Sequence, residues 1–169
     1  MEKLYKMGSS PHIRTGENIE KIMYDVIFAL TPSLLASIYF FGIRALLLTI
    51  VSVVTCIITE FSLNKFMNKE ESHFDGSAII TGMLLAFLVP SNLPYPLIIL
   101  GALISIALGK MVFGGLGHNV FNPAAVGRIF FFFFYPVTMT TWPFVNGFDG
   151  SSHSIISSAV TGATALSFI

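Results

Sequence analysis

The sequence predicts an all-α fold, a polytopic membrane helix bundle, and three observations lead to this prediction. The 169 residues are 54% hydrophobic and only 11% charged, whereas about a quarter of an ordinary soluble domain is charged. The apolar residues are gathered into five runs, and 17 phenylalanines add to the apolar bias. A soluble domain of this size needs a charged exterior that this composition does not supply, so we expect the bundle to lie in a lipid bilayer.

The five apolar runs follow one another along the chain, and we expect each to form a transmembrane helix. The first two, Ile22–Phe41 and Ala45–Leu63, are close to the ~20 residues that a helix needs to cross a bilayer. The third, Ala78–Val89, has only 12 residues and spans about 18 Å as a helix, against a hydrocarbon core of about 30 Å. The fourth and fifth run from Leu97 to Phe113 and from Ala124 to Val137.

The distribution of basic residues indicates that the short third run crosses the membrane. If it crosses, eight of the nine Lys and Arg residues lie on one side, which the preference of cytoplasmic loops for basic residues identifies as the cytoplasm. If it only dips in and returns, the split falls to six against three. We therefore predict five crossings, with the N-terminus in the cytoplasm. The eight residues are Lys3, Lys6, Arg14, Lys21, Lys65, Lys69, Lys110 and Arg128, and the outer one is Arg44.

The chain accordingly divides into three regions. Residues 1–21 mix acidic and basic side chains without an apolar core, so they read as a cytoplasmic arm and not as a targeting peptide. Residues 22–137 form the five-helix transmembrane region. Residues 138–169 form an outer loop, and their last five, Ala165–Ile169, resemble the start of a sixth helix that is cut off. We expect this chain to be about the first half of a longer protein, because many membrane carriers pair two similar halves.

Few side chains within the apolar runs are candidates for chemistry. Asp25 and Glu60 lie near the cytoplasmic ends of their helices, and we expect them to reach the interface or cap a neighbour. Lys110, near the end of the fourth helix, is expected to snorkel toward water. Cys56 is the one cysteine, and a single thiol makes neither an internal disulfide nor a cysteine-cluster site. The net charge of zero gives no indication of a nucleic-acid partner.

The loop between the fourth and fifth helices is the most distinctive segment. Gly115 and Gly117 allow tight backbone paths at membrane depth, and Asn119 and Asn122 are placed to hydrogen-bond carbonyl groups that helices leave open. Pro123 suits the first turn of a helix capped by Asn122. The loop is either an ordinary structured turn or a flavin-contacting loop, because exposed backbone N–H groups in such turns suit a polar ring edge.

A stretch of small residues near the C-terminus is a second candidate site. It runs Thr161-Gly162-Ala163-Thr164 and leads into the apolar Ala165–Ile169. Either threonine suits a plain helix N-cap. The same position also suits a phosphate, since unpaired N–H groups and the helix dipole attract an anion at a helix N-terminus.

Several strings taken together resemble one family, the D subunit of the Rnf-type ion-translocating ferredoxin:NAD oxidoreductase. The related B subunit of the sodium-pumping NADH:quinone reductase shares the architecture. The likeness runs from about residue 9 to residue 166, in the family's order and rough spacing. It is carried by Ser10–Arg14, Asp25–Pro32, Gly76–Pro90, Phe113–Arg128 and Thr161–Thr164.

The resemblance implies a flavoprotein subunit of an ion pump, built like the first half of a ten-helix inverted-repeat fold. In that family a flavin mononucleotide (FMN) is joined through its phosphate to the last threonine of a Ser/Thr-Gly-Ala-Thr motif, here Thr164, by a flavin transferase. Ser158 stands where such motifs commonly carry an Asp. A second, non-covalent flavin such as riboflavin is a further candidate ligand. The implied partners are the other subunits of the complex, and the implied location is the bacterial inner membrane with Thr164 on the outer face.

Two other functional classes are compatible with the same residues. The chain also suits half of a small-solute channel or transporter without a redox role, since broken helices and a glycine-rich loop line substrate paths. A structural scaffold for neighbouring subunits is a third interpretation. Covalently bound flavin separates the redox class from the other two. The residues do not indicate whether a pumped ion would be sodium or a proton.

Overall fold

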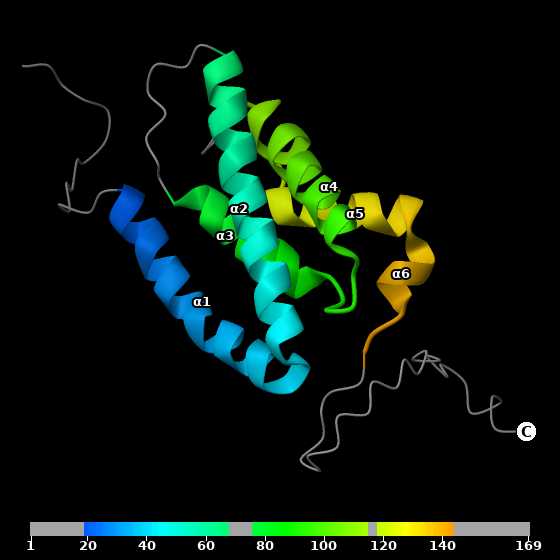
Figure 1. Cartoon of the computed structure of the whole chain (residues 1–169). Coiled ribbons are helices and arrows are strands. Elements are labelled where there is room, and N and C mark those ends of the chain that lie inside the picture. The colour runs from blue at the N-terminus through cyan, green and yellow to red at the C-terminus, as the bar shows by residue number, and fades with distance from the viewer. Residues whose placement is uncertain (1–18, 68–75, 115–117, 144–169) are drawn as a thin grey trace, which may run out of the picture.

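The computed structural model describes residues 19–67, 76–114 and 118–143, and every regular element in these ranges is helical. The chain begins with a hairpin of two long helices, α1 (Ile19–Phe41) and α2 (Ile43–Phe66). They are joined at Gly42, whose φ of 74° lies in the left-handed region that favours glycine. Figure 1 shows α1 descending to this turn and α2 returning from it.

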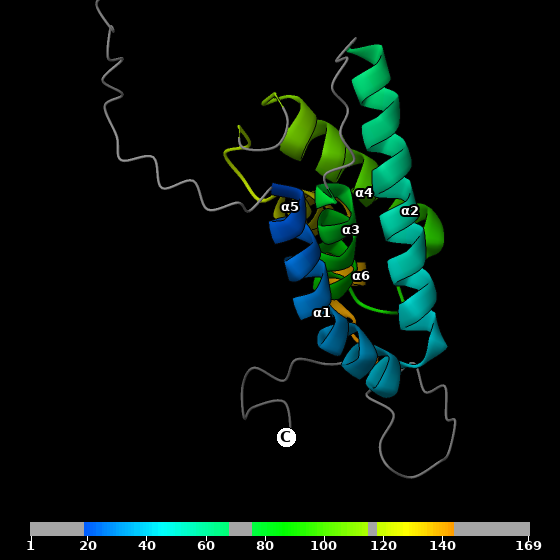
Figure 2. The same ribbon diagram turned by 90° about the vertical axis from the view of Figure 1, so that its left-hand side faces the viewer.

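Shorter helices follow and pack against α2. All five apolar runs of the sequence are helices, which confirms the predicted all-α class. Figure 2 shows α3 between α1 and α2, and Figure 1 shows it passing behind α2. The shorter elements are α3 (Ser77–Leu88), α4 (Tyr95–Ile106), the π-helical turn η1 (Ala107–Met111), α5 (Pro123–Phe134) and α6 (Pro136–Thr140).

The structure corrects the predicted end of the fifth helix. We expected it to reach Val137, but α5 ends at Phe134 and the short helix α6 begins at Pro136. The cause is local, because a residue before proline is driven out of the α conformation, and Tyr135 has φ −135° and ψ 54°. Part of the segment assigned to the outer loop from residue 138 is therefore helical.

Helix α3 packs closely on α2 because a glycine lies at the contact. A Cβ atom on Gly82 would be only 2.6 Å from the Cα atom of Val53, so no larger residue fits without moving backbone. At the same crossing the Ser52 hydroxyl donates to the Gly82 carbonyl at 2.9 Å. This close approach fixes where α3 begins relative to α2, and the candidate site lies at that beginning.

Helices α4 and α5 meet along a regular seam of small residues. On α4 and the η1 turn that continues it, the contacting positions are four residues apart. They meet positions on α5 that are four residues apart in the opposite direction, so the two segments pack antiparallel. Such small side chains let two helix backbones approach closely in membrane proteins. The contacting pairs are Gly101 with Phe131, Ser105 with Gly127, and Gly109 with Pro123.

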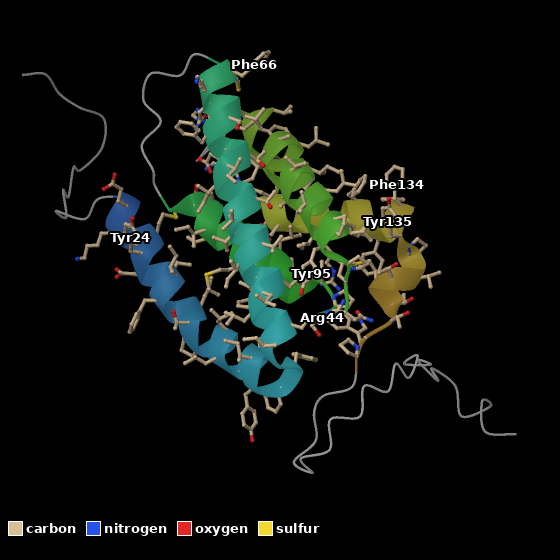
Figure 3. The ribbon with its side chains drawn as sticks, viewed as in Figure 1. Tyr24, Arg44, Phe66, Tyr95, Phe134 and Tyr135 are labelled. Carbon is tan, nitrogen blue, oxygen red and sulfur yellow. The ribbon has the colours of Figure 1, made fainter. Side chains whose placement is uncertain are left out.

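The exterior of the bundle is apolar. Phe66 at the end of α2 is 87% exposed and Phe133 on α5 is 79% exposed, and Figure 3 shows Phe66 pointing away from the bundle. By length and composition, the helices at Glu20–Phe41 and Ile43–Phe66 are able to cross a membrane. The other apolar helices are shorter, and Figure 1 shows α5 at a steep angle to α2. The crossing of α3 and α5 therefore stays a prediction.

Candidate functional site

A buried ion pair lies at the point where α2, α3 and η1 meet. The Nζ atom of Lys110 is 2.5 Å from Oε1 of Glu60, and the two side chains are only 3% and 14% exposed. The same ammonium donates a hydrogen bond to the hydroxyl of Ser77, the first residue of α3. Our expectation that Lys110 would snorkel to water is therefore wrong, and Glu60 pairs with Lys110.

The pair lies within the bundle because of two local features. Glu60 comes six residues before the end of α2 at Phe66, which is about 9 Å along a helix. Lys110 belongs to the π-helical turn, in which the Val112 N–H donates to the Ala107 carbonyl at 3.0 Å. A π turn carries an extra residue and so changes the direction of the side chains around it.

Gly109 brings the π-helical turn against the first residue of α5. A Cβ atom added at Gly109 would be 2.7 Å from the Cα atom of Pro123. Asn122 caps this helix, since its Oδ1 atom accepts a hydrogen bond from the Ala124 N–H at 3.0 Å. The predicted Asn122 cap and Pro123 first turn are thus confirmed, and the start of α5 is held beside Lys110.

The side chains of Asn119 and Asn122 leave one acceptor and one donor in the loop. Asn119 donates from Nδ2 to the Phe121 carbonyl at 3.0 Å, which is the kind of open carbonyl expected for it. This leaves Oδ1 of Asn119 as an acceptor and Nδ2 of Asn122 as a donor without hydrogen-bond partners in the described part of the chain. The loop turns at Gly114, whose φ is 109°.

These residues line one partly open pocket of about 250 Å³. Its wall has two chemically different parts, an apolar part from α1, α3 and the first residue of α5, and a polar part from α3, η1 and the loop. This combination suits a ring system with one apolar and one polar end, such as the isoalloxazine ring of a flavin. The apolar residues are Met23, Ile80, Leu84 and Pro123, and the polar ones are Ser77, Thr81, Lys110, Asn119 and Asn122.

The motif residues Thr161, Gly162, Ala163 and Thr164 lie outside the described residues, as do Gly115 and Gly117 of the loop. Of the ionisable groups, Asp25 is exposed on α1 and makes no ion pair with the described residues. Cys56 is fully buried on α2.

The fold and the pocket together indicate a class of protein. An all-α bundle with an apolar surface and a charged pocket among its helices is typical of polytopic membrane proteins with a functional site inside the bundle. Comparison with known families identifies one family within this class. The family model of NQR2, RnfD and RnfE matches residues 6–169. The chain belongs to this family.

Several curated relatives are similar over most of the chain. The D subunit of the proton-translocating ferredoxin:NAD(+) oxidoreductase complex of Clostridium ljungdahlii is 40% identical over 141 residues, which cover 83% of this chain and 43% of the relative. The D subunit of the Na(+)-translocating ferredoxin:NAD(+) oxidoreductase complex of Acetobacterium woodii is 40% identical over 139 residues, 82% of this chain and 44% of the relative. The D subunit of the ion-translocating oxidoreductase complex of Actinobacillus succinogenes is 38% identical over 167 residues, which cover 94% of this chain and 47% of the relative. The chain thus spans under half the length of these relatives.

Sequence reasoning missed the Glu60–Lys110–Ser77 cluster. One signal was present, because Glu60 and Lys110 lie in two different apolar runs and a buried charge is usually paired with an opposite one. A second signal was the Gly101, Ser105 and Gly109 spacing, a small-residue pattern that predicts a close helix contact. The π-helical turn that brings Lys110 inward has no recognisable sequence signal.

Proposed function

We propose that this chain is part of a membrane subunit of an ion-translocating oxidoreductase complex and carries electrons through bound flavin. The observation that carries the proposal is the pocket itself, with an apolar wall, two asparagines and a buried ammonium group. Family membership supports it, because the curated relatives are named as D subunits of such complexes. Flavin supplies the electron-transfer chemistry, and the protein supplies position and electrostatics.

The two asparagines match the polar edge of a flavin ring. That edge presents an N–H group between two carbonyl groups, so it requires an acceptor next to a donor. Oδ1 of Asn119 and Nδ2 of Asn122 supply such a pair on the wall of one pocket. Met23, Ile80 and Leu84 would face the apolar end of the ring. A non-covalent flavin such as riboflavin is therefore our candidate for this pocket.

The second flavin of the proposal is FMN joined covalently to Thr164. Thr161, Gly162 and Ala163 would complete the motif that a flavin transferase reads. With the predicted topology, Thr164 lies on the outer face and the Lys110 pocket lies toward the cytoplasm. Two flavins at these places would form a relay from one side of the inner membrane to the other, next to the remaining subunits of the complex.

Substitution at Thr164 tests the covalent site. In the full-length protein, co-expressed with the transferase, Thr164→Ala removes the hydroxyl that accepts the phosphate and should abolish fluorescence of the denatured band. Thr161→Ala is the matched control and should largely keep it. Fluorescence that persists in Thr164→Ala would refute the assignment. A full-length protein that never holds flavin would favour the alternative of a channel or transporter half.

A further inference from the structure

We infer that Lys110 sets the reduction potential of the flavin proposed for the pocket, with Glu60 acting in the opposite direction. The inference rests on the proposed function, because it assigns roles to two residues toward a flavin in that pocket. Lys110 lines the pocket and is 3% exposed. The roles that their sequence positions suggested do not account for the placement of Lys110 and Glu60 inside the bundle.

The position of the ammonium group is fixed by three elements. Oε1 of Glu60 on α2 holds it at 2.5 Å, and the Ser77 hydroxyl at the start of α3 accepts a second hydrogen bond from it. The close contact of Gly109 with Pro123 holds the π-helical turn against α5. A charge held in this way cannot move away from the pocket to relax the field that it creates there.

A flavin ring that takes up two electrons and one proton at N5 gains a negative charge over N1 and the neighbouring C2 carbonyl. A fixed positive charge close by stabilises this reduced form over the neutral oxidised form and so raises the reduction potential. The carboxylate of Glu60 opposes it from farther back, since its Oε1 lies against Nζ of Lys110. The two charges act more strongly than they would in bulk water because both side chains are largely buried.

The test compares two single substitutions and their combination. Each is made in full-length protein with Thr164→Ala, so that covalent flavin is absent, and riboflavin is the probe. Lys110→Met should weaken binding of reduced relative to oxidised riboflavin at least tenfold, which lowers the two-electron potential by about 30 mV or more. Glu60→Gln should raise the potential, and the double variant should return toward the parent because the net charge is restored.

The opposite signs distinguish this role from a purely structural one. Loss of packing would weaken oxidised and reduced riboflavin together in both variants and leave the potential unchanged. Lys65→Met, which removes an exposed positive charge near the end of α2, is the control and should shift the potential much less. Potentials that move in the same direction, or not at all, in the two single variants would overturn this inference alone. If the parent binds no riboflavin, the proposed flavin pocket is refuted as well.

Discussion

The buried ion pair gives a sharp prediction about stability. Lys110→Met leaves the Glu60 carboxylate, which is only 14% exposed, without its positive partner. Glu60→Gln leaves the Lys110 ammonium, which is 3% exposed, beside a neutral amide. In each single variant we expect a loss of about 3–5 kcal/mol of the free energy of unfolding, the usual cost of an uncompensated buried charge.

The magnitude follows from two opposing terms. At the 2.5 Å separation of the two atoms and an effective dielectric constant of ~20, the attraction is roughly 7 kcal/mol. Removing both ions from water costs several kcal/mol each, so the pair as a whole contributes little net stability. The Glu60→Gln/Lys110→Met double variant should therefore lie within about 1 kcal/mol of the parent, although each single variant is clearly destabilised.

The assay is reversible unfolding of the detergent-solubilised protein, with all four species measured at the same lipid and detergent content. The double-mutant cycle should give a coupling energy of at least about 5 kcal/mol, far above the usual 0.2–1 kcal/mol of an exposed ion pair. A coupling energy below about 1 kcal/mol would show that the pair is not buried, and the site as described would be wrong.

Three further predictions concern packing, capping and topology. Gly82→Ala places a Cβ atom 2.6 Å from the Cα atom of Val53 and should cost about 1–3 kcal/mol of stability; an unchanged unfolding midpoint would contradict the close contact. Asn122→Ala removes the cap of α5 and should lower the free energy of unfolding by about 1 kcal/mol, and it should also weaken riboflavin binding. Asn122→Asp keeps the cap and removes the Nδ2 donor, so it tests the contribution of this donor to riboflavin binding separately. Cysteines introduced at Ser10 and Ser151 should react with an impermeant reagent from the cytoplasmic and outer sides respectively, and the reverse pattern would refute the topology.

The fold class was predictable because apolar runs of this kind have few other stable forms. Backbone groups in a bilayer must be hydrogen-bonded within the segment, so long apolar runs become helices. The Asn122 cap was predictable for a similar reason, since the residue type, the following proline and the start of an apolar run agree at one place. Where local signals agree in this way, the sequence is sufficient.

The charged part of the site was not predictable because it depends on packing between distant segments. Lys110 and Glu60 are 50 positions apart in the chain, and each alone is compatible with a snorkelling or interfacial side chain. Only the close contacts of Gly82 with α2 and of Gly109 with α5 bring both residues to the start of α3. The end of α5 at Phe134 was likewise decided by one local detail, the proline at 136, within an otherwise uninterrupted apolar run.

The seam between α4 and α5 also restricts how the site can change shape. Its contacts recur every fourth residue along α4 and η1 and along α5, so sliding one segment past the other by a single residue would press a larger side chain into the close contacts made by Gly101, Gly109 and Gly127. The next compatible arrangement is four residues away, about 6 Å along the axis. Helices α4 and α5 should therefore move together as one rigid unit, and the part of the pocket wall formed by Lys110 and Pro123 should keep its shape.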